Sequence, residues 1–241
     1  MVAGLAFLAT AIATVFAQAT GVRFTKKRKP HERAWTIALA LFALASAALA
    51  TGASTGWDLG TFRAFYLLGA VLCVPWLGLG TVYLLAGAKA GHRVETGLIL
   101  FTGFAIGVVL SAPIHGHIAP DGGIPIGKDH FGVLPRVLAG VASGVGATVV
   151  LVGAIWSAVR FARSRAPGTS RLAAGNALIA LGTLVLSSGG LIQGAVGKDQ
   201  AFAATLASGI AVIYAGFAVA SSTPRPASAR SARRGTLPAK L

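Results

Sequence analysis

The sequence predicts an all-α integral membrane protein whose single membrane domain is a bundle of seven transmembrane helices. Hydrophobic residues make up 55% of the 241 residues and charged residues only 11%, whereas soluble domains carry roughly 25% charged residues. Seven apolar stretches approach the ~20 residues that are needed to cross a ~30 Å hydrocarbon core. The basic residues gather between these stretches, which is typical of multi-pass membrane proteins.

The first of the seven expected spans has to be distinguished from a secretory signal. The first resembles a secretory signal in length, but no Lys or Arg precedes it and the positive charges follow it. We therefore expect an uncleaved first helix with its N-terminus outside. In chain order, the expected spans are Val2–Val22, Trp35–Ala53, Phe62–Ala86, Val94–Ile114, Val133–Val159, Leu172–Gln193 and Ala201–Ser221.

The distribution of positive charge predicts the orientation of the bundle. The segments Arg23–Arg33, Lys89–Arg93 and Arg160–Arg171, together with the C-terminal tail, hold 17 of the 21 Lys and Arg residues, and the alternate loops hold four. Cytoplasmic loops carry the excess of Lys and Arg, so we expect a plasma-membrane protein with its C-terminus in the cytoplasm. A miscounted helix would break this alternation, so the same numbers favour seven spans.

The chain divides into a transmembrane domain, residues 1–221, and a tail, residues 222–241. The tail is basic, rich in Pro, Ser and Ala, and has no apolar periodicity, which predicts disorder. The net charge of +15 lies at span ends and needs no nucleic-acid partner; we expect a bilayer with anionic headgroups instead. The candidate headgroup contacts are Arg23, Lys26, Lys27, Arg28, Lys29, Arg160, Arg163 and Arg165.

Two similar passages suggest an internal repeat. Residues 22–24 and 159–161 both read Val-Arg-Phe, and the helices that follow contain Ile-Ala-Leu at 37–39 and 179–181. The hypothesis is a 3+1+3 plan of parallel repeats, which has precedent in sugar transporters. The alternative is that Ala/Leu-rich helices resemble each other by composition. The Pro-Gln signature of PQ-loop transporters is missing, so the sequence assigns no family.

Several kinds of chemistry are disfavoured by what the spans lack. No span has Asp, Glu, Lys, Arg or His near its centre, which argues against a proton pump, a proton-coupled antiporter or a voltage sensor. The single cysteine, Cys73, excludes an intramolecular disulfide and any CxxC motif. Paired catalytic groups and nucleotide-binding fingerprints are missing too. We therefore expect no enzyme activity and assign no cofactor.

The loop after the fourth span contains the one metal-like pattern. His115 and His117 form an H-x-H pair, and His130 follows with Asp121 and Asp129 nearby. Imidazole ligands of this kind suit Zn²⁺ or Cu²⁺, so His115, His117 and His130 are the candidate metal ligands. The alternative is a solvated polar loop.

Within the spans, Pro75 is expected to free a backbone carbonyl and kink its helix. Small-xxx-small pairs are expected to let helix backbones approach: Gly103/Gly107, Gly140/Gly144 and Gly190/Gly194.

Two functions remain open at this point. One is an accessory, scaffold or sensor-like membrane subunit, whose partners would be other membrane subunits or a second copy of the chain. The alternative is a small transporter or channel for a neutral or lipidic solute, motivated by the repeat and by polar residues inside the spans. A cavity inside the bundle would favour the second function.

Overall fold

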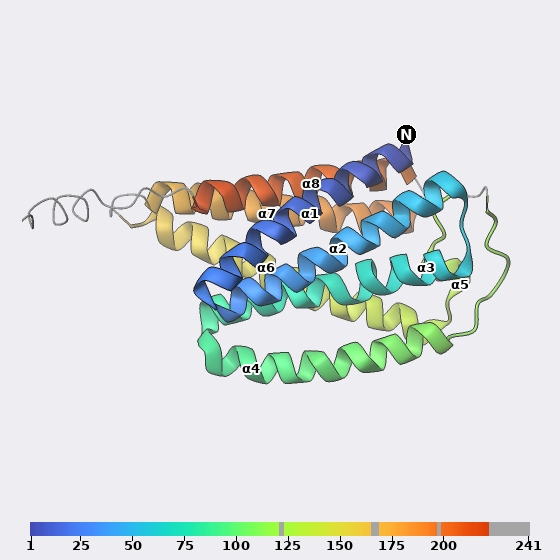
Figure 1. The fold of residues 1–241 in the computed structure, drawn as a ribbon, viewed down its shortest axis with the longest axis horizontal. Coiled ribbons are helices and arrows are strands. Elements are labelled where there is room, and N and C mark those ends of the chain that lie inside the picture. The colour runs from blue at the N-terminus through green and yellow to red at the C-terminus, as the bar shows by residue number, and fades with distance from the viewer. Residues whose placement is uncertain (121–122, 165–168, 197–198, 222–241) are drawn as a thin grey trace, which may run out of the picture.

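The computed structural model describes residues 1–120, 123–164, 169–196 and 199–221 (Figure 1). Across these residues the secondary structure is helical, apart from an isolated bridge between Ile114 and Phe131. This confirms the all-α membrane fold. The elements are α1 (Val2–Lys27), α2 (Pro30–Thr55), α3 (Leu59–Phe65), the π-helix η1 (Tyr66–Cys73), α4 (Val74–Ser111), α5 (Gly127–His130), α6 (Val133–Ala162), α7 (Thr169–Val196) and α8 (Asp199–Ser221).

One glycine separates the third span from the fourth. From Leu59 to Ser111 the helical stretch is 53 residues long, which as a straight helix would measure about 80 Å, far more than a ~30 Å hydrocarbon core. Within α4, Gly87 has φ 83° and ψ 176°, a conformation that suits glycine. The chain reverses there (Figure 1). Residues 59–86 thus form the third span and residues 88–111, the second limb of α4, form the fourth.

Six of the seven spans form a closed ring. Around the ring, each helix packs on the next in the order α1, α2, the third span, α6, α7 and α8. The ring closes because α8 packs on α1. The second limb of α4 lies outside the ring against the third span, where Trp76 Nε1 donates to Thr102 Oγ1 at 3.3 Å. A β-carbon on Gly91 would lie 2.1 Å from the Tyr83 ring, so this glycine permits the close contact.

The order of the helices around the ring is the one that the repeat hypothesis requires. A rotation by three positions places α1 on α6, α2 on α7 and the third span on α8, and it converts every neighbouring pair into another neighbouring pair. The exchanged helices cross the bundle in the same direction (Figure 1). This order is compatible with a parallel repeat about an axis along the membrane normal, with the fourth span as the linker, and the repeat stays a prediction.

Glycines bring helix backbones together, but they are not the predicted pairs. A β-carbon on Gly182 of α7 would lie 2.8 Å from the carbonyl oxygen of Gly209 of α8, and one on Gly146 of α6 would lie 2.7 Å from that of Val74. These are close backbone crossings.

The predicted small-xxx-small pairs were wrong as packing sites. Around Gly103, Gly107, Gly140, Gly144 and Gly190 there is nothing within 4 Å of an added β-carbon. The spacing of two glycines does not say which side of a helix faces a neighbour, and these glycines face open space. The surroundings of Gly194 lie outside the described residues.

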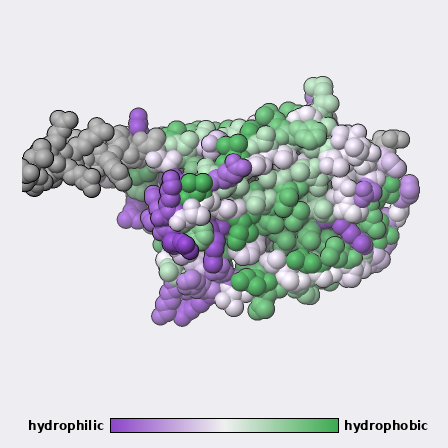
Figure 2. Space-filling model, viewed as in Figure 1, coloured by the Kyte–Doolittle hydropathy of each residue, from purple (hydrophilic) through white to green (hydrophobic). Residues whose placement is uncertain are grey.

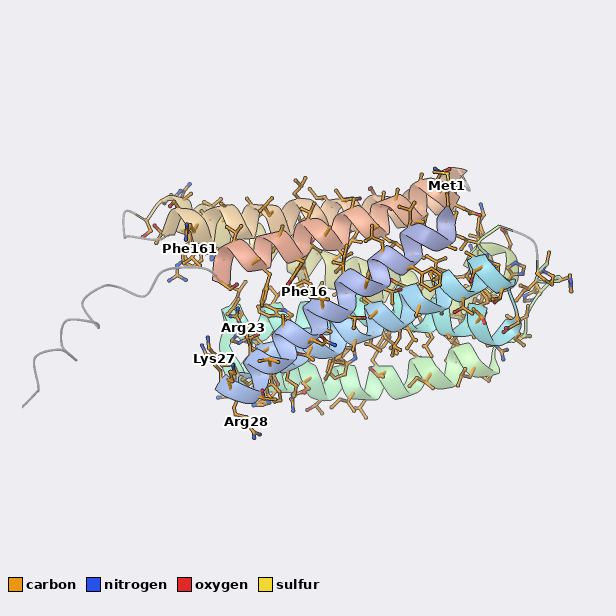
Figure 3. All side chains as sticks on the ribbon, turned by 45° about the horizontal axis from the view of Figure 1, so that its top comes forward. Met1, Phe16, Arg23, Lys27, Arg28 and Phe161 are labelled. Atoms are coloured by element: carbon orange, nitrogen blue, oxygen red, sulfur yellow. The ribbon has the colours of Figure 1, made fainter. Side chains whose placement is uncertain are left out.

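The two ends of the bundle differ in polarity. Lys27, Arg28 and Phe161 lie at one end and Met1 at the other (Figure 3), and hydrophilic surface gathers at the first end beside a hydrophobic band (Figure 2). The reversal at Gly87 lies at the same end (Figure 1). We call this the basic end and the other the opposite end. The basic segments thus share one end, as the alternation predicted.

At the opposite end, α3 begins with a side-chain cap. The Asp58 carboxylate accepts hydrogen bonds from the backbone N–H of Thr61 at 2.8 Å and from its hydroxyl at 2.9 Å. This satisfies a backbone donor that the first turn of a helix leaves free. The two hydrogen bonds hold the pKa of the Asp58 carboxyl below its usual value.

Candidate functional site

The ring of helices encloses a cavity of about 530 Å³. Its walls come from α2, the third span, α6, α7 and α8. Small and apolar side chains dominate the lining, and none of the described residues that line it is charged. Among these residues, the polar lining consists of the hydroxyls of Ser46, Ser143, Thr183 and Ser187 and the buried thiol of Cys73.

The cavity is elongated along the bundle axis. On α8 its lining runs from Phe202 to Ile213, which is about 17 Å of helix at 1.5 Å per residue. Toward the opposite end, Phe65 and Phe202 both line the cavity, and their rings meet edge to face with centroids 6.1 Å apart. This aromatic pair forms a lid between the cavity and the opposite end. Toward the basic end, the lining extends to Ala38 and Val150.

One side of the cavity is exposed. The lining residues from α2, the third span and α8 are buried or half-buried, whereas Gly140 and Gly144 of α6 and Ser187 and Gly190 of α7 are exposed. Figure 1 shows α6 leaving α7 near the basic end and separating from it toward the opposite end. The cavity therefore opens sideways between α6 and α7, through a face that would be covered by lipid.

The π-helix η1 forms part of the wall because of Pro75. In a π-helix each N–H bonds the carbonyl five residues earlier, and the next carbonyl in this series after η1, that of Ala70, would need the N–H of residue 75. Proline has none. The hydroxyl of Ser143 on α6 donates to the Ala70 carbonyl instead, at 2.5 Å. The prediction that Pro75 frees a carbonyl is met in this way, and the helix widens into η1 beside it.

At the basic end of the bundle, an ionic network joins the second, third and fourth spans. Glu95 accepts hydrogen bonds from Arg33 and from the Tyr83 hydroxyl, the latter at 2.5 Å. His92 Nδ1 lies 2.9 Å from the same hydroxyl. The network ties both sides of the reversal at Gly87 to the start of α2.

A second ion pair joins the first two spans at the same end. Glu32 is 1% exposed, and its Oε1 accepts from Arg23 Nε at 3.0 Å. Its Oε2 is buried with no hydrogen-bond partner among the described residues. The Arg23 guanidinium also lies 4.7 Å from the centre of the Phe217 ring, which favours the cation there. Arg23 is thus a structural residue of the α1–α2–α8 contact.

The predicted headgroup residues divide into two groups. Arg23 is paired with Glu32, and Arg165 lies outside the described residues. The rest are exposed at the basic end: Lys26, Lys27, Arg28, Lys29, Arg160 and Arg163.

The predicted metal ligands lie in the loop at the opposite end. The His115 N–H donates to the His130 carbonyl at 2.9 Å, and His130 Nδ1 lies 3.2 Å from the His115 carbonyl. These contacts bring His115 and His130 together, while His117 is exposed. In the part of the chain that the structure describes, no three metal-ligating side chains form a group. Asp121 lies outside that part, and the metal site stays a prediction.

The comparisons with known proteins give no relative: no family model matches the chain, and no curated protein or solved structure matches it.

No motif in the sequence points to the cavity, to the buried Glu32 or to the half-buried Glu95. Ser46, Ser143 and Ser187 occur among many polar residues in the spans, and no motif distinguishes them. Glu32 falls in the basic segment Arg23–Arg33, and Glu95 lies two residues after the segment Lys89–Arg93, at positions where a carboxylate is expected to be solvated. A usable signal in the sequence is that these two are the acidic residues within or next to the basic segments, whereas the other four, Asp58, Asp121, Asp129 and Asp199, lie in the alternate loops.

Proposed function

We propose that this protein binds a neutral, lipid-like molecule inside its helix bundle and exchanges it with the surrounding membrane, as a small transporter or carrier of a lipidic solute. The observation that carries the proposal is the apolar cavity with its opening between α6 and α7. Of the two functions expected from the sequence, it favours this one.

The size and lining of the cavity support a small apolar ligand. Ligand pockets have volumes of about 300–1,000 Å³ and mostly hydrophobic walls, and this cavity has about 530 Å³. A charged ligand would have to give up water without a partner of opposite charge, since no charged side chain lines the cavity. A neutral molecule that already resides in the bilayer meets no such cost when it enters sideways.

Photolabelling in vesicles tests the proposal. A photoreactive hydrocarbon (a diazirine-bearing hexadecane) should label Ile210 and Ile213, which are 2% and 5% exposed and line the cavity. Side chains this buried are shielded from the bulk lipid, so label there reports on the cavity. Mass spectrometry of the α8 peptides locates the label.

A cavity-filling variant and a matched control make the test specific. Gly144→Leu adds a bulky side chain to the cavity lining at its exposed side and should reduce labelling at Ile210, whereas Gly107→Leu lies on the fourth span, away from the lining, and should leave it unchanged. Equal labelling of Ile210 in both variants, or none in the unmodified protein, would contradict the proposal.

The accessory, scaffold or sensor-like subunit stays the second candidate. The fourth span lies outside the six-helix ring, and its exposed side chains include Leu100 and Phe104. A partner helix or a second copy of the chain would find room there. Cross-linking of a cysteine placed at Gly107 in native membranes tests this function, and an uncross-linked monomer would count against it.

We also propose that the protein lies in the plasma membrane with its N-terminus outside and its basic end in the cytoplasm. The excess of Lys and Arg at the basic end supports this orientation. A cysteine at Ala119, exposed at the opposite end, should react with an impermeant thiol reagent on intact cells, and one at Lys29 should not. Native Cys73 is buried and gives little background. Reaction at Lys29 alone would reverse the orientation.

At the basic end, the exposed Lys and Arg residues are proposed to contact anionic headgroups, at roughly 1 kcal/mol per residue near the surface.

A further inference from the structure

Most hydroxyls inside the spans are used by their own helices. Thr102 donates to the carbonyl of Leu98 and Thr183 to that of Ile179, each four residues earlier. Such a bond satisfies the hydroxyl and lets it sit in an apolar environment. Ser46 is different. It is 2% exposed and lines the cavity, and its hydroxyl has no hydrogen bond within the described chain.

Ser187 on α7 lines the same cavity and also makes no hydrogen bond in the described residues. Ser143 on α6 uses its proton on the Ala70 carbonyl, and its oxygen retains lone pairs that can accept. Among its described lining residues, the cavity thus contains two hydroxyls with free donors, and two more, those of Ser143 and Thr183, whose oxygens can accept. Burying a hydroxyl without a hydrogen-bond partner is unfavourable. A ligand in the cavity that hydrogen-bonds to Ser46 would remove this cost.

The three serines lie at similar distances along their helices from the opposite end of the bundle. Ser46 is nine residues from the end of α2 at Thr55, Ser143 is ten residues from the start of α6 at Val133, and Ser187 is nine residues from the end of α7 at Val196. All three helix ends are at the opposite end of the bundle (Figure 1). At 1.5 Å per residue, each serine lies about 14 Å along its helix from the opposite end. This is about half the thickness of a ~30 Å hydrocarbon core.

We infer that the ligand is a neutral lipid-like molecule carrying a hydroxyl or carbonyl oxygen, which Ser46 and Ser187 bind at mid-membrane depth. This rests on the proposed function and adds the polar chemistry of the ligand. From Ser46 the lining continues eight residues toward the basic end, to Ala38, about 12 Å of helix. That deeper part is mostly apolar, since the Thr183 hydroxyl there donates to its own helix, and it takes the hydrocarbon tail, while Phe65 and Phe202 cover the oxygen-bearing end.

The physical basis of selection is the absence of water at this depth. In the bilayer core an alcohol or ketone finds no hydrogen-bond donor, and a plain hydrocarbon loses nothing there. The free donors of Ser46 and Ser187 therefore favour the oxygen-bearing molecule over a hydrocarbon of the same length. A single hydrogen bond contributes on the order of fivefold in binding.

Two photoprobes of equal length test the inference in vesicles. A diazirine-bearing hexadecanol should label Ile210 at about fivefold lower concentration than the matching hexadecane probe, by the worth of one hydrogen bond. Ser46→Ala should remove this preference without changing the hydrocarbon labelling. Because Ser46 makes no hydrogen bond among the described residues, the thermal unfolding of the Ser46→Ala variant should also be unchanged. Ser187→Ala is the second variant.

The control is Ser208→Ala, since Ser208 is exposed on α8 and its hydroxyl donates to the Ala204 carbonyl. It should leave the preference intact. Equal labelling by the two probes, unchanged in Ser46→Ala, would overturn the role of the serines while leaving the cavity as a hydrocarbon site. Labelling of Ile210 by neither probe would instead overturn the proposed function itself.

Discussion

The hydroxyl of Ser143 on α6 donates to the carbonyl oxygen of Ala70 at the point where Pro75 removes a backbone donor from the third span. One side chain thus compensates a proline on another helix and fixes how α6 packs beside the cavity. The wall of the cavity depends on this bond.

Ser143→Ala should leave the Ala70 carbonyl unsatisfied in an apolar wall, at a cost of about 1–3 kcal/mol in the free energy of unfolding. In a Pro75→Ala background the restored N–H can bond a carbonyl of η1, so the same change should cost less than half as much. Unfolding in detergent measures both. Equal costs in the two backgrounds would disprove the compensation.

The two ion pairs at the basic end should differ in energetic weight. Glu32 is 1% exposed, so Arg23→Ala leaves a buried carboxylate alone and should cost about 3–5 kcal/mol. Arg33 is 43% exposed and Glu95 keeps the Tyr83 hydroxyl, so Arg33→Ala should cost about 1 kcal/mol or less. The exposed Arg28, changed to Ala, is the control. Similar losses in the first two variants would contradict the ranking.

Close backbone crossing can be tested at Gly146. Its β-carbon would lie 2.7 Å from the carbonyl oxygen of Val74, so Gly146→Ala should destabilise the bundle by about 1–3 kcal/mol through overpacking. At Gly103, where nothing lies within 4 Å, the same substitution should be neutral or stabilising by up to about 1 kcal/mol. Thermal unfolding in detergent ranks the two variants, and the reverse order would be inconsistent with the crossing.

The cap of α3 should weaken at low pH. Hydrogen bonds from the Thr61 N–H and hydroxyl lower the pKa of Asp58 in the folded state. The contribution of the cap is therefore present above the unfolded pKa and is lost as the pH falls through the folded pKa. The amide resonance of Thr61 should shift with a midpoint below the usual Asp range. Asp58→Asn should abolish that titration; if it persists, another group causes it.

Much of the fold follows from simple physical constraints visible in the sequence. Apolar length gives the spans, and the basic segments show which loops share an end. The reversal at Gly87 is predictable because the stretch around it is too long for one crossing. The packing glycines were not predictable, because the spacing of Gly140 and Gly144 is equally compatible with a helix contact and with a cavity wall.

The cavity and its serines could not be found in the sequence for a similar reason. Ser46, Ser143 and Ser187 come from three different helices and span 141 residues of sequence, and only the closed ring brings them to one cavity. In the sequence, Glu32 lies in a basic segment that is expected to be solvated. Only the fold shows that Arg23 lies beside it. The predicted histidine site rested on spacing alone, and it stays a prediction.

The sideways opening between α6 and α7 has a consequence for how affinity should be expressed. A molecule that enters from the lipid is governed by its mole fraction in the membrane, so a dissociation constant in aqueous units will drift with the amount of lipid in the assay. Each added CH₂ improves partitioning by about 0.8 kcal/mol, so chain length alone changes the aqueous value roughly fourfold per carbon. Under the proposed function, partitioning into the bilayer selects molecules first. The protein then selects only among molecules that are already dissolved in the bilayer.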